Sequence, residues 1–357
     1  MSLRVYLDHA ATSPVRPEAI SAVCEGLTHW ANPSSPHAAG RAARSLLENA
    51  RGAIGQALGW DHEVILTSGA SEAIALALGS AKGGARLVSA VEHESVLRAV
   101  PDAERLPVRS DGALDMEVLT EAIDGRDRPV VAVQAINSET GNAQDIGQIA
   151  ERVHESGGLL VVDAAQSAGK YPLPAEADMV IVSAHKLGGP PGVGALLVRD
   201  YAMIEASGGQ ERGYRPGTEN LPGAMGFAAA LEACAAGPWL APDVLEPLAP
   251  FVQKVRDAGG VWLSDDLSAP TDYICALAMP DMSGSAQLMR FDMAGIAVSQ
   301  GSACSSGSLK RSHVLEAMTM DEALADRMIR VSFGWNTTRE DIERFCETWL
   351  QLAEVRG

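Results

Sequence analysis

The sequence predicts an α/β protein, with a large domain built on a mostly parallel central sheet and a smaller α+β domain. Short apolar runs alternate with helical patterns over most of the chain, and strands separated by helices form parallel sheets covered on both faces. Prolines and a glycine at 237–242 interrupt this pattern, and a second set of short strands follows them. We therefore expect the large domain at 14–240 and the small domain at 1–13 and 241–357.

Composition and charge exclude several classes of protein. The chain has 357 residues, 46% of them hydrophobic, so it can bury a large core. Its 46 acidic and 28 basic residues give a net charge of −18, which argues against nucleic acid and anionic membranes as partners. No apolar run is long enough to cross a bilayer and no signal region begins the chain, so we expect a cytoplasmic protein. Five widely spaced cysteines without a CxxC pair predict neither disulfides nor a metal site.

One short strand and two helices are expected near the beginning of the chain. The strand covers residues 5–7, and a helix that starts at a proline runs from about residue 17 to residue 30. A polar loop broken by prolines follows, and its Asn32 could hydrogen-bond a substrate or serve only its own backbone. Apolar residues then recur on one face of a helix at 38–58.

Six buried strands are expected in the part that follows, because apolar runs are bounded there by turn residues. Polar clusters follow most of these strands, and the carboxyl ends of parallel strands face one ligand-binding crevice. The expected strands are residues 64–66, 86–90, 130–136, 158–162, 179–182 and 193–198.

Lys186 lies on the short turn between the last two of these strands. It could be an ordinary solvated lysine, because charged side chains are seldom buried. Partial burial would instead favour the neutral amine, which forms a Schiff base with an aldehyde, and pyridoxal phosphate is the usual aldehyde held in this way. Residues upstream of Lys186 favour the second interpretation.

Two upstream features supply what a pyridoxal phosphate enzyme needs. Asp163 follows a buried strand, where its carboxylate could pair with a protonated pyridine nitrogen. The run 67–71 leads from a strand into a helix at 72–80, and the free N–H groups there, with the Ser71 hydroxyl, form a candidate phosphate site. A glycine run at 188–194 does not predict a dinucleotide site, because it leads into a strand and not into a helix.

The rest of the chain begins with a polar segment. Residues 207–220 are glycine-rich and charged, which makes them too polar for the core and typical of a surface loop. An alanine-rich helix at 221–236 follows. The last part predicts helices and four short strands, which the strand at 5–7 is expected to join, near residues 261–263, 273–278, 297–299 and 329–332.

Cys304 lies in a loop of glycine and serine residues, unlike the other four cysteines. Such a loop suits a nucleophile that reaches a substrate and carries a group away, although an ordinary surface thiol fits it equally well. Cys24, Cys234, Cys275 and Cys346 stand among apolar neighbours, where free cysteines are usually buried.

Seven motifs stand in order along the chain, namely TSGASEAI, VEHESVL, VDAAQS, SAHK, RPGTEN, GSACSSGS and IRVSFGWNTT. Together they resemble the motifs of the NifS and IscS-like cysteine desulfurases, a branch of the class V aminotransferase-fold enzymes. The resemblance starts at YLDHAATSPV and reaches the last expected helix, so it covers essentially the whole chain. It implies the type I fold of pyridoxal phosphate-dependent transferases.

The resemblance implies a role for each matching position. Lys186 would hold pyridoxal phosphate and move the substrate α-proton, and His93 would stack on the ring and assist proton transfer at the thiol. Asp163 would pair with the ring nitrogen, and Gln166 would contact the ring oxygen. Further cofactor contacts are implied for Ala70, Ser71, Asn137, Ser138, Ser183, His185 and, across a homodimer interface that includes residues 207–220, Thr218 of the partner subunit.

The implied reaction converts L-cysteine to L-alanine. Arg330, with Asn32, would bind the substrate carboxylate, which a guanidinium suits well. The thiolate of Cys304 would attack the substrate sulfur and become a persulfide. Its sulfur would pass to an acceptor protein or a small thiol, for iron–sulfur clusters, another sulfur-containing cofactor or thiolated RNA.

Several positions depart from the family pattern. Ser138 stands where a second asparagine is usual, so either Ser138 contacts the cofactor more weakly or Asn137 substitutes for it. The chain ends soon after its last expected helix, without the longer tail where scaffold proteins dock in the IscS type, which leaves other sulfur acceptors open. Smaller departures are Ile74, Ala75, Ala184 and Pro216.

Two other functions stay open. A different substrate on the same fold, as in an aminotransferase or a selenocysteine lyase, is disfavoured by Cys304 in its GSAC loop. A non-catalytic accessory protein would be expected to lack Lys186, Asp163 or Cys304, and this chain has all three.

Overall fold

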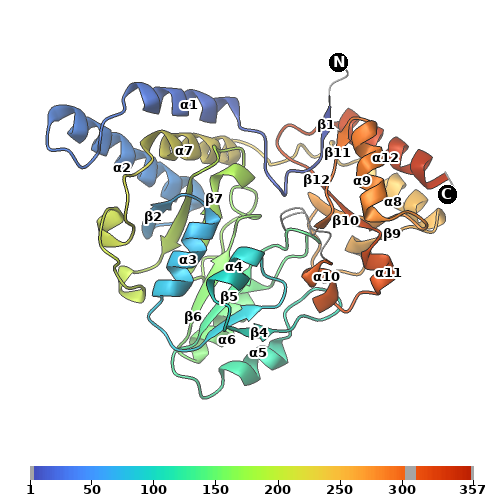
Figure 1. Ribbon diagram of the computed structural model, residues 1–357, viewed down its shortest axis with the longest axis horizontal. Helices are drawn as coiled ribbons and strands as arrows, with labels where there is room; N and C mark the ends of the chain where they lie inside the picture. Colours follow the sequence, from blue (N-terminus) through green and yellow to red (C-terminus); the bar gives the residue numbers. More distant parts are fainter. Residues whose placement is uncertain (1–3, 302–310, 355–357) are drawn as a thin grey trace.

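A computed structural model describes residues 4–301 and 311–354 (Figure 1). The largest sheet has β8 antiparallel to both of its neighbours, and its other neighbouring strands are parallel. The expected α/β class and the mostly parallel sheet are therefore confirmed. Side by side, the strands are β2 (Glu63–Thr67), β8 (Gly194–Val198), β7 (Met179–Ser183), β6 (Leu159–Asp163), β5 (Val130–Gln134), β3 (Arg86–Ser89) and β4 (Glu104–Leu106).

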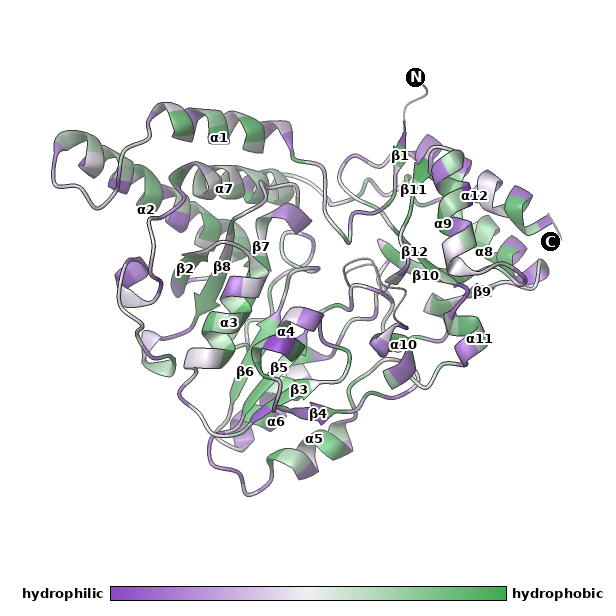
Figure 2. Ribbon diagram, in the orientation of Figure 1, coloured by the Kyte–Doolittle hydropathy of each residue, from purple (hydrophilic) through white to green (hydrophobic). Residues whose placement is uncertain are grey.

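Strand side chains alternate between two hydrophobic layers. In β5, Val131 and Val133 belong to one layer, and Val130 and Ala132 belong to the other. Every residue of β5, β6, β7 and β8 is buried, so these strands are apolar on both faces, and the ribbon coloured by hydropathy shows this (Figure 2). Burial on both faces explains why the sequence shows continuous apolar runs here and no polar–apolar alternation.

Helices close both layers (Figure 1). The layer of Val131 contains residues of α1 (Pro17–Thr28), α2 (Ala38–Leu58), α5 (Met116–Ile123), α6 (Ile146–Glu155) and α7 (Leu221–Ala235). The layer of Val130 contains residues of α3 (Ala70–Ser80) and α4 (Glu94–Ala99).

Local signals set the ends of α2, which agree with the expected bounds. The helix starts after His37, whose Nδ1 accepts a hydrogen bond from the Gly40 N–H. It ends at Gly59, which has a φ of 65°, a left-handed conformation that glycine adopts without strain.

The C-terminal part has two small sheets. An antiparallel sheet has the order β12 (Met328–Ser332), β10 (Ile274–Ala278) and β9 (Val261–Trp262). β1 (Val5–Tyr6) pairs in parallel with β11 (Ile296–Ala297), which confirms that the first strand joins this part of the chain. The domain boundaries proposed above stay a prediction. The helices here are α8 (Leu248–Asp257), α9 (Gly284–Met293), α10 (His313–Ala317), α11 (Glu322–Ala325) and α12 (Arg339–Glu354).

An aromatic cluster forms the core of this part. The ring centroid of Phe251 lies 5.7 Å from that of Phe345 and 5.6 Å from that of Trp349, both edge-on.

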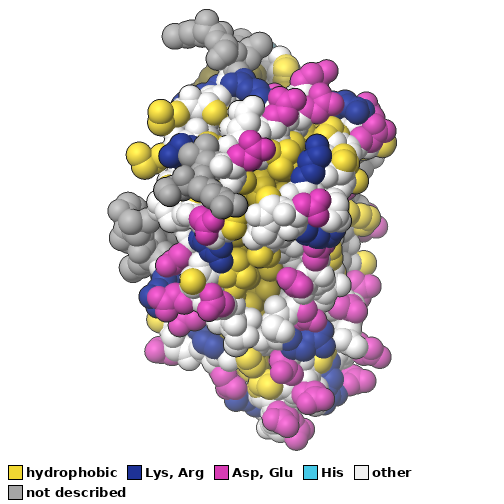
Figure 3. All heavy atoms as spheres, turned by 90° about the vertical axis from the view of Figure 1, so that its right-hand side faces the viewer, with side chains coloured by type: hydrophobic (Ala, Val, Ile, Leu, Met, Phe, Trp, Pro, Cys, Tyr) yellow, Lys and Arg dark blue, Asp and Glu magenta, His cyan; other side chains and the backbone are white. Residues whose placement is uncertain are grey.

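On the outside, acidic side chains are spread over the face shown in Figure 3, with a band of hydrophobic side chains between them. Across residues 4–301 and 311–354, no helix combines the length and apolarity needed to cross a bilayer.

Candidate active site

Four polar segments meet at one edge of the large sheet. Because β3, β5, β6 and β7 are mutually parallel, their carboxyl ends lie at the same edge. His93 follows β3, Asn137 follows β5, Asp163 ends β6, and Lys186 follows β7. Asp163 and Lys186 both act electrostatically on His93, so these three side chains form one electrostatically coupled group.

Lys186 ends a single 3₁₀ turn, Ala184–Lys186, between β7 and β8. The turn is tight because Gly188 follows it with a φ of 90°. Lys186 is half-buried, and its Nζ donates hydrogen bonds to the carbonyl oxygens of Ala10, at 2.6 Å, and of Ala11, at 2.8 Å. The amine is therefore held by the backbone of the N-terminal segment, and the solvated-turn interpretation is not supported.

Gln166 shares one of these carbonyl groups. Its Nε2 donates to Ala10 O at 2.9 Å, and its backbone oxygen accepts a hydrogen bond from the hydroxyl of Tyr273 at 2.7 Å. Its Oε1 is buried and has no hydrogen-bond partner among the described residues. An unpaired buried oxygen is costly, so this atom marks a position where a bound group is expected.

Burial shifts the two ionisable groups beside Lys186 towards their neutral forms. Burial raises the pKa of the Asp163 carboxyl above its ordinary value. The Ala165 N–H, His93 and Lys186 favour the ionised carboxylate, but their effect is smaller than that of burial. Burial likewise lowers the pKa of His93. The Nδ1 of His93 is engaged by Ser95, at 2.7 Å from its hydroxyl and 3.2 Å from its N–H, because His93 caps α4.

The candidate phosphate site lies where α3 begins, two residues earlier than expected. Gly69 precedes the helix with a φ of 146°, and Ser71 in its first turn is exposed. Ser183 is buried at the end of β7. The Nδ1 atom of His185 lies 3.1 Å from the hydroxyl oxygen of Thr12. Burial lowers the pKa of His185 to about 4, and the positive charges of Lys186 and Lys170 act in the same direction.

The side chain of Asn137 forms hydrogen bonds with the backbone of the turn in which it lies and with the backbone of Val91. Its Oδ1 accepts hydrogen bonds from the N–H groups of Glu139 and Thr140, each at 2.9 Å, and its Nδ2 donates to Val91 O at 3.2 Å. This turn explains why β5 ends at Gln134, although the apolar run predicted a strand to residue 136.

Arg330 is 4% exposed and is already partly paired. One terminal nitrogen donates to the Asp8 carboxylate at 2.7 Å and the other to Ser138 O at 2.8 Å. Its Nε has no partner in the described part of the chain. Sequence reasoning missed Asp8, although its position after the first strand was a usable signal.

Among the described residues, Asn32 is not brought into this group by any contact. The Oδ1 of Asn32 accepts a hydrogen bond from the Ser34 N–H at 2.9 Å, so the structure shows it serving its own backbone. Cys304 lies outside the described residues.

The segment 207–220 is fastened to its own subunit by three ion pairs. Glu211 pairs with Arg51, Arg215 pairs with Glu72, and Glu219 pairs with Arg44, and two of these carboxylates are fully buried. Most of the segment is exposed or half-buried, as expected of a surface loop, and its two buried carboxylates are neutralised by arginines on α2. Thr218 lies between these anchors and is exposed in the single chain.

Of the other four cysteines, three are buried and one is exposed. Cys234, Cys275 and Cys346 are buried as expected, and burial raises the pKa of Cys275 and of Cys346 to about 12. Cys24 is exposed, so its prediction as a buried residue was wrong.

Lys170 is a further basic residue near this group that sequence reasoning missed. Its Nζ lies 4.8 Å from the ring centroid of Trp239 and 5.0 Å from that of Tyr273. Burial first, and then the charge of Lys186, lowers the pKa of Lys170 to about 7. Its position in the segment after Asp163 was the available sequence signal.

Lys170→Met should change how stability depends on pH. The folded chain holds the pKa of Lys170 at about 7, against 10.5 for an ordinary lysine, so between these values only the unfolded chain binds the proton. The free energy of unfolding of the wild type should therefore rise with pH relative to the variant, by at most about 1.4 kcal/mol per pH unit. Urea unfolding of both proteins at pH 7, 8 and 9 measures this, and parallel pH profiles would contradict it.

Comparisons with known proteins agree over the length of the chain. The family model for aminotransferase class-V matches residues 5–345. The chain is 37% identical to a cysteine desulfurase of Cereibacter sphaeroides, over 98% of this chain and 96% of the relative. It is 34% identical to cysteine desulfurase IscS 1 of Archaeoglobus fulgidus, over 98% of this chain and 97% of the relative.

Solved structures with a similar fold include two with more than a quarter of their residues identical. A NifS-like protein from Rickettsia africae ESF-5 has a TM-score of 0.87 and 27% identity, over 99% of this chain and 100% of that one. A structure described as SspA in complex with cysteine has a TM-score of 0.79 and 28% identity, over 92% of this chain and 98% of that one. The match to the family model, residues 5–345, includes the strands and turns that carry the candidate site.

Proposed function

This chain belongs to the aminotransferase class-V family, and we propose that it acts within that family as a cysteine desulfurase that depends on pyridoxal phosphate. The family resemblance seen in the motifs is thereby confirmed. The observation that carries the function is full-length similarity to cysteine desulfurases in a chain whose Lys186, Asp163 and His93 form one group at the strand ends.

The described residues fit a bound pyridoxal phosphate. Gln166 has an unpaired Oε1, and its Nε2 donates a hydrogen bond to Ala10 O, the same carbonyl oxygen that accepts from Lys186. Asp163 is a buried carboxyl group, and a cationic ring nitrogen beside it would favour its ionised form. When bound, the cofactor supplies an aldehyde for the amines and an electron-withdrawing ring that makes the substrate α-proton acidic.

Each residue of the site would hold a different part of the cofactor. Lys186 would bind it covalently, Asp163 would pair with the ring nitrogen, Gln166 would contact the ring oxygen, and His93 would stack on the ring. The internal bonds of Asn137 support the alternative in which Ser138, and not Asn137, faces the cofactor. The phosphate group would be bound by Ala70, Ser71, Ser183, His185 and Thr218 of the partner subunit.

The reaction moves one sulfur atom and two protons. The Lys186 amine, oriented by the carbonyl groups of Ala10 and Ala11, would take the α-proton of L-cysteine and return a proton to the product. Burial keeps His93 neutral, so it could receive the proton of the substrate thiol and pass it to the β-carbon, which becomes the methyl group of alanine. The Cys304 thiolate would attack the substrate sulfur, the carbon–sulfur bond would break, and the products would be a Cys304 persulfide and L-alanine.

Arg330 would bind the substrate carboxylate. A buried guanidinium with one unpaired nitrogen can accept a second anionic partner, and Asp8 holds its charge and orientation until the substrate arrives. Asn32 would assist only if it exchanged its bond to Ser34 N for one to the substrate. The sulfur would then pass from Cys304 to an acceptor protein or a small thiol.

One assay tests this function. Purified protein should convert L-cysteine to alanine and sulfide in equal amounts when dithiothreitol releases the bound sulfur. Without dithiothreitol, the peptide that contains Cys304 should gain roughly 32 daltons, the mass of one sulfur on a thiol. A protein that retains pyridoxal phosphate but forms no alanine would overturn the proposal.

The exposed face of α1 supports a homodimer. Ile20 is 52% exposed and Leu27 is 62% exposed, seven residues apart and so on one face of the helix, and Trp30, just beyond the helix, is 47% exposed. A second copy of the chain is the partner that the exposed Thr218 requires, because its hydroxyl would complete the phosphate site of the other subunit.

Thr218→Ala should weaken cofactor retention about ten-fold, because a hydrogen bond to a charged phosphate is lost. Equilibrium dialysis of pyridoxal phosphate measures the affinity, and sedimentation measures the oligomeric state. Thr348→Ala, which removes a hydroxyl on α12, is the matched control. A dimeric Thr218→Ala protein with wild-type affinity would contradict the shared site.

A further inference from the structure

Glu139 lies in the turn that follows β5, at the same sheet edge as the candidate site. Its backbone N–H is fixed by Asn137 Oδ1 at 2.9 Å, and the next two residues complete the turn, with Gly141 at a φ of 80°. The preceding residue is also fixed, because Ser138 O accepts a hydrogen bond from Arg330 at 2.8 Å. The Glu139 carboxyl group therefore projects from a well-anchored backbone and is half-buried.

This carboxyl group touches both ends of the segment 302–310. Ser312, just after the segment, donates a hydrogen bond from its hydroxyl to Glu139 Oε2 at 2.5 Å. Gly301, just before it, packs so closely against the same carboxyl group that an added Cβ would collide with Oε2. The two chain ends that flank residues 302–310 thus converge on one carboxylate.

A second contact joins the residues just after segment 302–310 to the catalytic edge. This is the edge of the large sheet where His93, Asp163 and Lys186 lie. His313 Nε2 lies 2.9 Å from the backbone oxygen of Glu92, the residue before His93. Burial raises the pKa of the Glu92 carboxyl well above its ordinary value, and its Oε1 accepts a hydrogen bond from Gln134 N at 2.7 Å, so this anchor is part of the core. The Ser312 hydroxyl also caps α10 by accepting from Leu315 N at 3.1 Å.

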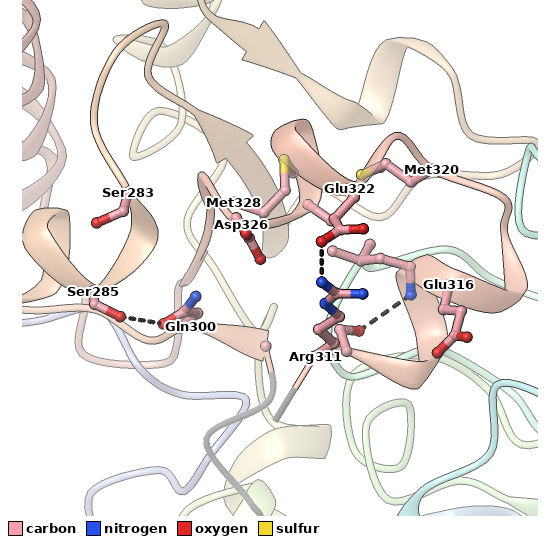
Figure 4. Close-up of a pocket in the computed structure, with 13 residues that line it drawn as sticks. Ser283, Ser285, Gln300, Arg311, Glu316, Met320, Glu322, Asp326 and Met328 are labelled. Carbon is pink, nitrogen blue, oxygen red and sulfur yellow. Dashed lines mark hydrogen bonds and ion pairs between the residues drawn. The ribbon is translucent and has the colours of Figure 1, made fainter. Parts of the chain in front are cut away.

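Residues of both ends, including Gly301 and Ser312, also line a cavity of about 580 Å³. Figure 4 shows Gln300 beside Ser285 and Arg311 paired with Glu322, one from each end. Glu139 contacts both ends but is not among the residues that line this cavity.

We propose that Glu139 is a positioning residue that holds both ends of the 302–310 segment at the catalytic edge, so that the Cys304 thiol meets the substrate sulfur. The inference rests on the proposed function, in which Cys304 receives the sulfur. Anchoring both ends of a short segment confines a group within it to a small volume, which raises its effective concentration at the substrate. Substrate binding at Arg330 does not depend on the carboxyl group of Glu139, so the effect falls on the transfer step.

Glu139→Ala should lower kcat for alanine formation about ten-fold, the size expected for a lost hydrogen bond to a charged group, with KM changed less than about two-fold. Glu139→Gln keeps an acceptor oxygen for Ser312 and should recover most of the rate. Ser312→Ala removes the donor, so the double variant should be no slower than Glu139→Ala alone. Glu104→Ala, which removes an exposed carboxylate on β4, is the control for a general loss of charge.

Limited trypsin digestion of substrate-free protein gives a readout that does not depend on turnover. Cleavage after Lys310 and Arg311 should be several-fold faster in Glu139→Ala than in the wild type or Glu139→Gln. A wild-type kcat in Glu139→Ala, whatever the cleavage rate, overturns the inference, and so does a wild-type cleavage rate. If the wild type forms no alanine, the proposed function is overturned instead. The trypsin cleavage rates of the wild type and Glu139→Ala then still test whether Glu139 anchors the segment.

Discussion

Lys186→Ala is expected to abolish alanine formation and covalent cofactor binding together. The side chain would provide both the amine that binds pyridoxal phosphate and the base for the α-proton. Loss of a general base alone lowers rates about 10²- to 10⁴-fold, so the combined loss should exceed about 10³-fold. Alanine production from L-cysteine measures the rate. Borohydride reduction followed by peptide mass analysis locates the covalent bond to the cofactor.

Lys82→Ala is the matched control for Lys186, because Lys82 is an exposed lysine outside the strand-end group. It should retain wild-type turnover and wild-type cofactor content. If borohydride fixes the cofactor to another lysine in the wild type, such as Lys170, the assignment of Lys186 is wrong. Turnover that persists in Lys186→Ala would have the same consequence.

Cys304→Ser should bind L-cysteine but form almost no alanine. A serine hydroxyl does not accept sulfur to form a persulfide, so we expect a loss of about 10³-fold or more in alanine formation. Buried thiols offer no substitute, because burial raises the pKa of Cys275 and of Cys346 to about 12 and keeps both protonated at neutral pH. The change in the cofactor absorption spectrum when L-cysteine is added measures binding, and alanine analysis measures transfer.

Cys24→Ser controls for the loss of an exposed thiol, since Cys24 is exposed on α1. This variant should form alanine at the wild-type rate and carry the persulfide on Cys304. Alanine formation by Cys304→Ser at the wild-type rate would remove Cys304 from the reaction. A persulfide on Cys24 in the wild type would point to a different route for the sulfur.

Elements set by local patterns were predictable from the sequence. The strands of the parallel sheet are continuous apolar runs, and α2 has an apolar face and a terminal glycine, so their positions followed from burial and turn chemistry. Lys186, Asp163 and His93 were predictable because parallel strands bring their carboxyl ends to one edge. β4 was not predicted, because Glu104 and Arg105 are exposed and give no apolar run.

Features that depend on pairing between distant segments were not predictable. The ion pair between Asp8 and Arg330 joins residues 322 positions apart, and nothing local at either residue indicates the other. The same holds for buried Glu211, which looks like part of a polar loop until Arg51 is placed beside it. Cys24 was misassigned because apolar residues lie on both sides of α1, and only the packing on α7 shows which side is exposed.

The carbonyl group of Ala10 accepts hydrogen bonds from both Lys186 and Gln166, and the neighbouring Asp8 reaches Arg330. The amine, the amide and the guanidinium are thus aligned by a segment that leaves the ribosome long before any of them. Contacts that close such long stretches of chain carry a large entropic cost and form late in folding. The catalytic edge should therefore be assembled last, after the large sheet has formed, and the ability to capture the cofactor should mark the completion of folding.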